Sequence, residues 1–378
     1  MKRRIYFDNA ATTVGKPECV LRAMHTALDK FGNPGRSGHD LSLNAAAEIY
    51  ECRKAVCRLF GCDKPERVVF TYNATYALNM AIKGYAENGC HILFSDFEHN
   101  SVIRPVHALS KDPCRGISYT VFNAAGSDRE IVYDFTSKIR PNTRLAVVTL
   151  ASNVCGKILP VAALGDICRK KNILLICDAS QAAGCVPINA KSLGVDVLCF
   201  AGHKSLYGPQ GSGGAIFCTD KEPEPVIEGG NGILSADKNM SGSLPERLEA
   251  GTLGTPAICG LCAGIGYVSK IGIGEIFERD TMLINRLTEN LATVKGVTLY
   301  GITDKRTPTL AFNKVGYASE EAAKLLNEQG ICVRGGFHCA PIAHTSLGTG
   351  EYGAVRASLS FMNTPAEIDA FSLAVNRL

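Results

Sequence analysis

The sequence of 378 residues lacks any long apolar run. None of its apolar stretches approaches the roughly 18 residues that a membrane-spanning helix requires, so the sequence predicts no membrane span. It also lacks an excess of charge of one sign, because 40 lysines and arginines stand against 36 aspartates and glutamates. Nucleic-acid-binding proteins carry a basic patch, and none is evident here. We therefore expect a small-molecule substrate.

We also expect no secretory signal peptide, because polar residues interrupt the segment 1–9 before an apolar stretch begins. Sixteen cysteines are present, but they are spread through apolar segments such as 173–178 and 197–200. Cysteines in such segments are typical of reduced core residues, so the sequence predicts a cytoplasmic protein without a disulfide framework. Cys259 and Cys262 form a C-x-x-C, but their apolar neighbours recur at helical spacing. That pattern favours a buried helix face, and no metal site is expected.

Short apolar runs alternate with helical patterns between about residues 40 and 220. Segments 43–60 and 161–172 carry apolar residues every three to four positions, as amphipathic helices do. The runs between such segments are continuous, as in strands buried on both faces of a sheet. They cover residues 67–71, 91–95, 117–122, 144–150, 173–178, 195–200 and 213–218. This alternation predicts an α/β layer with a mostly parallel sheet.

The pattern changes after Gly251, where a long helical stretch over 256–295 precedes widely spaced strands. Thr364 and Glu367 then form a capping box at the start of the last helix. The predicted strands of this part are 308–312, 331–334 and 354–361. The length of the chain also favours two domains, so we expect a second, smaller α+β unit here.

Polar residues that end apolar runs are candidate site residues, because ligands of open α/β sheets bind at the carboxyl ends of strands. Asp178 ends one run, and Lys204 follows the next run in a glycine-rich turn. A buried carboxylate there suits a protonated pyridine nitrogen, and a lysine in such a turn can form a Schiff base. Taken singly, Asp178 is as readily a helix cap and Lys204 a solvated surface residue.

Two further strand ends carry candidates. Ala74 and Thr75 open a helical pattern after strand 67–71, and free N–H groups at a helix start suit a phosphate. His99 follows strand 91–95, where an imidazole can stack on an aromatic cofactor and transfer protons. A helix cap at Thr75 and a structural histidine at 99 are the alternatives.

Cys339 differs from the other cysteines because it lies among glycines, in the segment VRGGFHCAP over residues 333–341. The glycines predict a mobile loop, and an exposed cysteine near cations can become a thiolate nucleophile. Arg356 lies on an otherwise apolar strand and needs an anion. That anion is either a substrate carboxylate or the acid of a structural ion pair.

Together these motifs resemble the class V aminotransferase family and, within it, the cysteine desulfurases and selenocysteine lyases with a short active-site loop. The similar segments are 6–13, 32–39, 98–102, 178–184, 202–213, 249–252, 333–341 and 356–364. The resemblance implies fold type I of the pyridoxal-phosphate (PLP) enzymes, with PLP as the cofactor. It implies a large PLP-binding domain over 15–255 with a mostly parallel central sheet. Residues 1–14 and 256–378 are expected to form a small α+β domain that carries the cysteine loop.

The resemblance also implies a role for each candidate residue. Lys204 resembles the lysine that binds the cofactor and moves the α-proton, Cys339 the sulfur acceptor, and His99 the ring-stacking residue. Asp178 resembles the partner of the pyridine nitrogen and Gln181 that of the phenolic oxygen. Thr252 resembles a threonine that reaches the phosphate of a neighbouring subunit, which implies a homodimer. The other positions are Ala74, Thr75 and His203 for the cofactor, and Asn153, Arg334 and Arg356 for the substrate.

The implied reaction converts L-cysteine to L-alanine and leaves a persulfide on Cys339, for transfer to an acceptor protein in sulfur mobilisation such as iron–sulfur cluster assembly. Selenocysteine is the alternative substrate. Other class V reactions, such as transamination, are a second alternative, although they need no loop thiol. A non-catalytic scaffold is a third, and it would need neither Lys204 nor Asp178.

Overall fold

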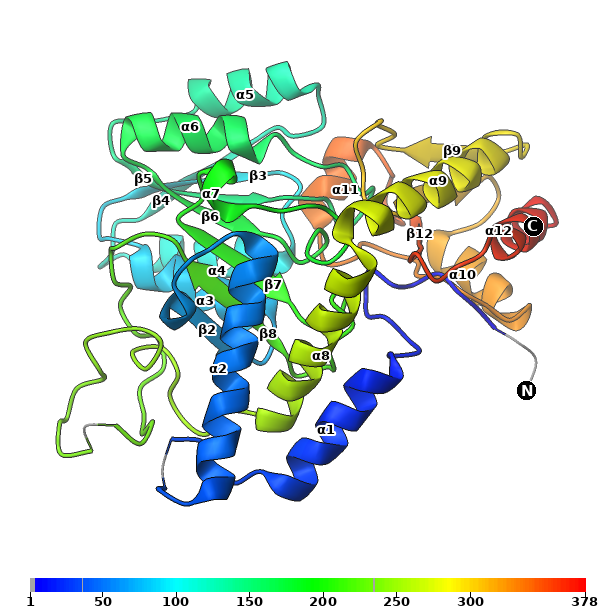
Figure 1. Cartoon of the computed structure of the whole chain (residues 1–378). Helices are drawn as coiled ribbons and strands as arrows, with labels where there is room; N and C mark the ends of the chain where they lie inside the picture. The colour runs from blue at the N-terminus through cyan, green and yellow to red at the C-terminus, as the bar shows by residue number, and fades with distance from the viewer. Residues whose placement is uncertain (1–3, 36, 234) are drawn as a thin grey trace.

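The computed structural model describes residues 4–35, 37–233 and 235–378 and contains a seven-stranded central sheet (Figure 1). The strands are β2 (Val68–Thr71), β3 (His91–Ser95), β4 (Ser118–Phe122), β5 (Thr143–Thr149), β6 (Leu174–Asp178), β7 (Val197–Ala201) and β8 (Gly213–Phe217). Their order is β2-β8-β7-β6-β5-β3-β4. In this sheet, β8 runs in the direction opposite to that of the other six strands. The α/β prediction is confirmed, and each of the seven predicted runs forms a strand.

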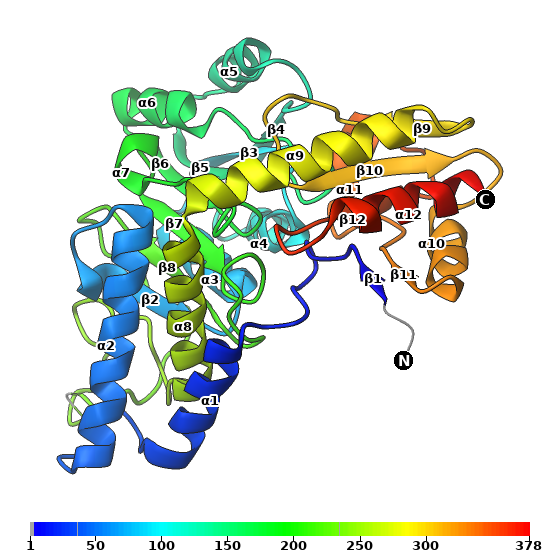
Figure 2. The ribbon, with the colours of Figure 1, turned by 45° about the vertical axis from the view of Figure 1, so that its right-hand side comes forward.

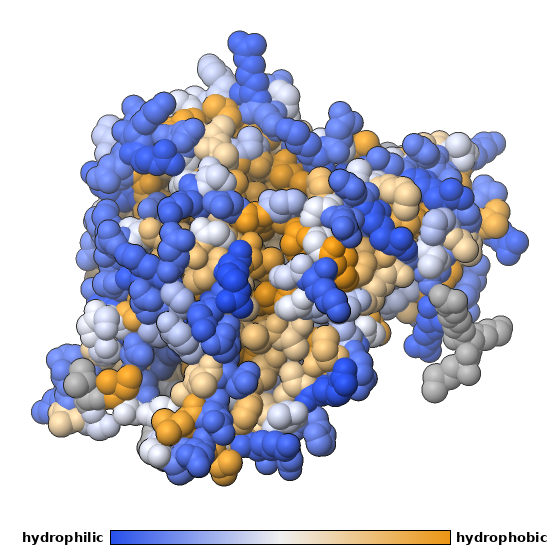
Figure 3. All heavy atoms as spheres, viewed as in Figure 1, coloured by the Kyte–Doolittle hydropathy of each residue, from blue (hydrophilic) through white to orange (hydrophobic). Residues whose placement is uncertain are grey.

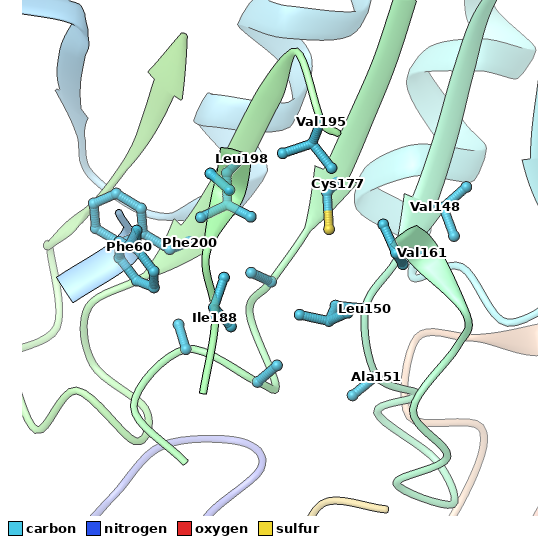
Figure 4. Close-up of a cluster of buried hydrophobic side chains, with 14 of the residues drawn as sticks. Phe60, Val148, Leu150, Ala151, Val161, Cys177, Ile188, Val195, Leu198 and Phe200 are labelled. Atoms are coloured by element: carbon cyan, nitrogen blue, oxygen red, sulfur yellow. The ribbon is translucent and has the colours of Figure 1, made fainter. Parts of the chain in front are cut away.

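Helices cover both faces of this sheet. One face packs against α3 (Ala74–Tyr85) and α4 (Asn100–Lys111). The other packs against α2 (Asp40–Phe60), α5 (Asp128–Ser137), α6 (Val161–Lys171), α7 (Ala190–Leu193) and α8 (Thr255–Ile271). Val148, Cys177 and Leu198, from three adjacent strands, point into the cluster on this second face (Figure 4). Burial on both faces explains why the runs lack polar alternation.

The last third of the chain forms two smaller sheets beside the central one (Figure 2). The antiparallel sheet contains β9 (Val297–Tyr300), β10 (Thr309–Lys314) and β12 (Val355–Ser358). The N-terminal β1 (Ile5–Tyr6) pairs in parallel with β11 (Ile331–Cys332). The helices of this part are α9 (Ile273–Ala292), α10 (Ser319–Glu328), α11 (Pro341–Leu347) and α12 (Pro365–Asn376). The predicted strand over 331–334 is therefore shorter than expected, and β1 and β9 are additional.

The long helical stretch predicted over 256–295 is two helices, because Gly272 interrupts it with a φ of +99°. Helix α8 lies between α1 (Glu18–Lys30) and α2, where an apolar strip is visible among hydrophilic residues (Figures 1 and 3). Its Cys259 is buried and its Cys262 contacts Cys52 of α2. No single described helix is long and apolar enough to cross a membrane; α8 and α9 reach that limit only together, across a 78° bend.

A buried ion pair joins α2 to the segment before α8. The two terminal nitrogens of Arg53 donate to the two carboxylate oxygens of Glu249, at 3.0 and 2.7 Å. The same carboxylate accepts the backbone N–H of Phe70 on β2 at 2.7 Å. Burial raises the pKa of Glu249, and the charge of Arg53 opposes this shift. The pair therefore ties a helix, a strand and a loop through one carboxylate.

We predict that Arg53→Ala lowers the free energy of unfolding by about 3–5 kcal/mol, because it leaves a buried carboxylate without its cation. Lys54→Ala is the matched control: the next residue pairs with Glu51 at the surface, and such pairs contribute about 0–1 kcal/mol. Urea denaturation followed by circular dichroism measures both. Equal losses in the two variants would contradict a special role for the buried pair.

Candidate functional site

A cavity of about 220 Å³ lies at the carboxyl ends of the central strands, where the N-terminal segment and the last third of the chain meet the sheet. Ten of the residues expected from the sequence line it: Ala74, Thr75, His99, Asn153, Asp178, Gln181, His203, Lys204, Arg334 and Arg356. They come from segments spread over most of the chain. The fold therefore brings together residues that the sequence only suggested one by one.

The acid of the candidate cofactor site is the last residue of β6, and the amide follows this strand. Asp178 is buried, and its Oδ1 accepts from the backbone N–H and the hydroxyl of Ser180, at 2.9 and 2.5 Å. These bonds close a turn rather than cap a helix, because the next helix, α7, begins only at Ala190. Gln181 is held by a bond from its Nε2 to the carbonyl of Ala10, at 3.1 Å. Both side chains face the cavity from a turn that these bonds fix.

Lys204 follows β7 and lines the same cavity. Burial lowers its pKa to about 8; Asp178 opposes this shift, and Arg356 and Arg334 add to it. The N-terminal segment fixes the backbone here, because the Thr13 hydroxyl donates to the carbonyl of Lys204 at 3.1 Å. A lysine with a pKa near 8 has a substantial neutral fraction near neutral pH, which a nucleophilic amine requires.

Two of the histidines that line the cavity, His99 and His203, are held neutral. His99 caps α4, and its Nδ1 accepts the backbone N–H of Ser101 at 3.0 Å, so its proton lies on Nε2. Burial, and then the charge of Lys204, lower the pKa of His99 to about 4. The same two causes, with Lys16, lower that of His203 to about 4. Positive charge in the cavity therefore comes from lysine and arginine alone.

Helix α3 starts at the cavity. Asn73 caps it, with its side chain accepting the N–H of Tyr76 at 3.1 Å. The N–H groups of Ala74 and Thr75 lie in the first turn, where no intrahelical carbonyl is available to them. Such a start, next to the Thr75 hydroxyl, suits a phosphate group.

Arg356 also lines the cavity and is buried, with 2% of its surface exposed. It donates to the carbonyl of Asn153 at 3.0 Å and to Oδ1 of Asp8 at 2.8 Å. Its Nε has no hydrogen-bond partner among the described residues. Arg334 pairs with Arg356 through the backbone, at 3.2 and 2.7 Å. Two positively charged guanidinium groups thus lie near the single carboxylate of Asp8. One positive charge is left unbalanced, and a second anion can balance it.

Asp8 is a site residue that the sequence reasoning did not single out. It lies in the segment 6–13, whose similarity to the family was noted, but its side chain was given no role. Arg356 therefore forms the structural ion pair that was the alternative to binding a substrate carboxylate. The pair involves only one of the two terminal nitrogens of Arg356. A buried arginine on an apolar strand was the signal, since it demanded an acid somewhere in the chain.

Cys339 is exposed and lies at the rim, next to the cavity-lining His338. Its loop is fixed by hydrogen bonds, in contrast to the mobile loop that the glycines suggested. The carbonyl of Cys339 accepts the N–H of Asn100 at 2.7 Å, and that of His338 accepts from Asn153 Nδ2 at 2.7 Å. His338 and Cys339 have φ values of +51° and +57°. This left-handed conformation costs roughly 1–2 kcal/mol for a residue with a side chain, so the surrounding bonds must maintain it.

Thr252 is the one expected cofactor residue that lies elsewhere. It lines two hollows next to Glu249 and Leu253, away from Lys204 and Asp178. Its role was expected toward a neighbouring subunit, so its place within one chain leaves that prediction open.

The donor set of the cavity fits PLP. The free N–H groups at the start of α3 suit the phosphate, and Asp178 supplies an anion for a protonated ring nitrogen. Lys204 is poised for covalent attachment, and Arg356 lines the cavity with a buried Nε that has no hydrogen-bond partner among the described residues. Each polar part of the cofactor therefore has a side chain or backbone group of the right chemistry.

Comparisons with known proteins agree with this geometry. The model of the class V aminotransferases matches residues 5–371. A probable cysteine desulfurase of Methanothermobacter thermautotrophicus is 32% identical, over 97% of this chain and 93% of its own. A probable cysteine desulfurase of Mycolicibacterium paratuberculosis is 31% identical over the whole chain, which spans 56% of that protein. The chain thus spans little more than half of some curated relatives.

Solved structures show the same fold. A cysteine desulfurase from Thermococcus onnurineus superimposes with a TM-score of 0.90 at 32% identity, covering 99% of this chain and 94% of that one. A cysteine desulfurase from Escherichia coli gives 0.86 at 26% identity, with the same coverage. The predictions of fold type I and of PLP, the cofactor of these enzymes, are confirmed. From residue 5 to residue 371, the chain belongs to the class V aminotransferase family.

Proposed function

We propose that the chain is a PLP-dependent cysteine desulfurase that converts L-cysteine to L-alanine and keeps the sulfur as a persulfide on Cys339. The observation that carries the proposal is the place of Cys339, on a fixed loop at the rim of the cavity that Lys204 and Asp178 line. Transamination needs no such thiol. The desulfurase names of the relatives support the same reaction.

The cofactor, when bound, supplies an electron sink for the carbon atoms of the substrate. The start of α3 and His203 would hold its phosphate, Asp178 its ring nitrogen and Gln181 its phenolic oxygen. His99 would stack on its ring and keep a proton on Nε2, directed away from Ser101. Lys204 would attach it and, once released, move the α-proton of the substrate, for which a pKa of about 8 is suited.

Arg356, Arg334 and Asn153 would bind the carboxylate of the amino acid. Asp8 holds one terminal nitrogen of Arg356 and so orients its planar group. Burial lowers the pKa of Arg356, while Asp8 and, more weakly, a charge on Cys339 raise it. Cys339 is thus near enough to Arg356 for a charge on its sulfur to stabilise the arginine cation.

The sulfur step takes place between two sulfur atoms. The Cys339 thiolate attacks the substrate sulfur, an S–S bond forms, and the Cβ–S bond of the substrate breaks. The electron pair of that bond stays with Cβ, which takes up a proton and becomes the methyl group of alanine. The persulfide then passes to an acceptor protein. We propose a homodimer in which Thr252 serves the neighbouring site, and a cytoplasmic location.

The first prediction concerns cofactor loading of the apoprotein. Because burial lowers the pKa of Lys204 to about 8, its amine becomes neutral about two pH units below an ordinary lysine. The rate of covalent PLP attachment is expected to rise with pH around a midpoint near 8, followed by absorbance and by borohydride trapping with peptide mapping. Lys204→Ala should trap no cofactor. A midpoint near 10.5, or trapping at another lysine, would contradict the assignment.

The second prediction concerns the thiol. Cys339→Ala is expected to reduce alanine formation from L-cysteine by at least about a hundredfold, because the nucleophile is lost. Selenocysteine and cysteine sulfinate release their leaving groups without a thiol, so the variant should keep measurable activity on both. Alanine release from the three substrates, with PLP absorbance as a folding control, measures the split.

Cys332 is the matched control. It is a partly buried cysteine at the end of β11, directly before the segment 333–341 that contains Cys339. Cys332→Ala should retain the activity of the parent on all three substrates. Full cysteine desulfuration by Cys339→Ala, or a persulfide mapped to Cys332, would overturn the mechanism and leave the PLP site standing.

A further inference from the structure

Two buried histidines next to Cys339 have no part in the reaction described above. His338 precedes the cysteine and His344 lies on α11, and they expose 3% and 1% of their surfaces. Their rings stack with centroids 5.2 Å apart and planes inclined by 25°. His338 Nδ1 and His344 Nε2 are 3.1 Å apart. The two imidazoles therefore form one hydrogen-bonded unit.

The outer partners of this unit fix where each ring proton lies. The carbonyl of Arg334 can only accept, so His338 carries a proton on Nε2, 3.0 Å from that oxygen. Burial and the charge of Arg356 lower the pKa of His338 to about 2 and that of His344 to about 4. Both rings are thus neutral near neutral pH, and Nδ1 of His338 is an acceptor. His344 must therefore donate from Nε2.

The chain of bonds continues to Thr349. Because Nε2 of His344 carries the proton, its Nδ1 is an acceptor, and the hydroxyl of Thr349 lies 2.8 Å from it. Thr349 is buried as well. The bonds run in one direction, from Thr349 through His344 and His338 to the carbonyl of Arg334. Both histidines have a partner at each ring nitrogen, which favours a single conformation of the loop.

This chain ends at the backbone that carries the thiol. His338 is fixed at its ring by His344 and Arg334, and at its carbonyl by Asn153. Cys339 follows at a φ of +57°, and its carbonyl is held by Asn100. If the ring of His338 were released, two successive non-glycine residues would be free to leave the left-handed region.

We propose that His344 is a positioning residue that, through His338, holds Cys339 in the left-handed conformation that presents its thiol to the cavity. The inference rests on the proposed desulfurase function, in which that thiol attacks the substrate sulfur. The histidine pair therefore supports the attack of the Cys339 thiol on the substrate sulfur. Steps that the cofactor site performs without the thiol should not depend on His344.

Two substitutions at one position separate the bonds. In His344→Gln, the amide nitrogen takes the place of Nε2 and can still donate to His338. In His344→Asn, the shorter amide takes the place of Nδ1 and can meet only Thr349. The PLP-loaded proteins are compared by kcat/KM for L-cysteine and for L-cysteine sulfinate, and by hydrogen exchange of peptides covering residues 335–341.

The expected result is a change of substrate ratio. His344→Asn should lower the cysteine to sulfinate ratio of kcat/KM about tenfold, the loss of one net hydrogen bond in the thiol-dependent step, with faster exchange confined to the loop. His344→Gln should recover most of the ratio. Equal losses of kcat/KM on both substrates would overturn the proposal, because a purely structural residue gives that result. Unchanged kcat/KM on both substrates in His344→Asn would overturn it as well, because the residue would then play no part.

Thr349→Val provides a second route if the histidine variants fold poorly, since it removes only the hydroxyl at the far end of the chain. It should shift the ratio in the same direction by about two- to fivefold. An unchanged ratio would overturn the proposal here too. Failure of the desulfurase function is recognised separately: the parent protein would then form no alanine from cysteine. In that case faster loop exchange in His344→Asn but not in His344→Gln supports the positioning role, and equal exchange overturns it.

Discussion

One guanidinium group, that of Arg356, connects three parts of the chain that otherwise form separate sheets. It belongs to β12 of the antiparallel sheet, donates to Asp8 beyond β1, and donates to the carbonyl of Asn153 beyond β5 of the central sheet. A buried arginine is costly unless its donors are matched, so these three segments must meet at one point. The cavity is the space that remains where they meet, and its positively charged wall is a by-product of that junction.

The electrostatics of the cavity follow from the same junction. Lys204, Arg334 and Arg356 share a small buried space with Asp8 and Asp178. Burial, and then the two arginines, lower the pKa of Lys204, although Asp178 opposes this shift. Burial, and then the nearby positive charges, also lower the pKa values of His99, His203 and His338 and keep these rings neutral. Because these histidines stay neutral beside the cations, each of them has one ring nitrogen that can donate a hydrogen bond and one that can accept. The site is thus arranged to attract anions while it keeps several groups available for proton transfer.

Much of this arrangement was predictable from the sequence, and the exceptions have a common cause. Asp178 and Lys204 could be predicted as site residues because each lies at or just after the end of a continuous apolar run. The end of a strand is visible in the local sequence. The strand β1 was missed because two residues carry no periodicity. The partner of Arg356 was missed because Asp8 lies 348 positions away. The loop around Cys339 was expected to move because glycines are visible in the sequence, whereas the bonds from Asn100 and Asn153 that hold it are not.

The N-terminal segment is synthesised long before most of the residues that it contacts in the site. Asp8 is synthesised before β2 to β8, which are complete by residue 217, and Arg356 is synthesised after them. The central sheet can therefore fold around Asp178 and Lys204 while the C-terminal third is still being made, since domains fold as units during synthesis. In the order of its synthesis, the protein gains the means to hold a cofactor before it gains the means to select a substrate.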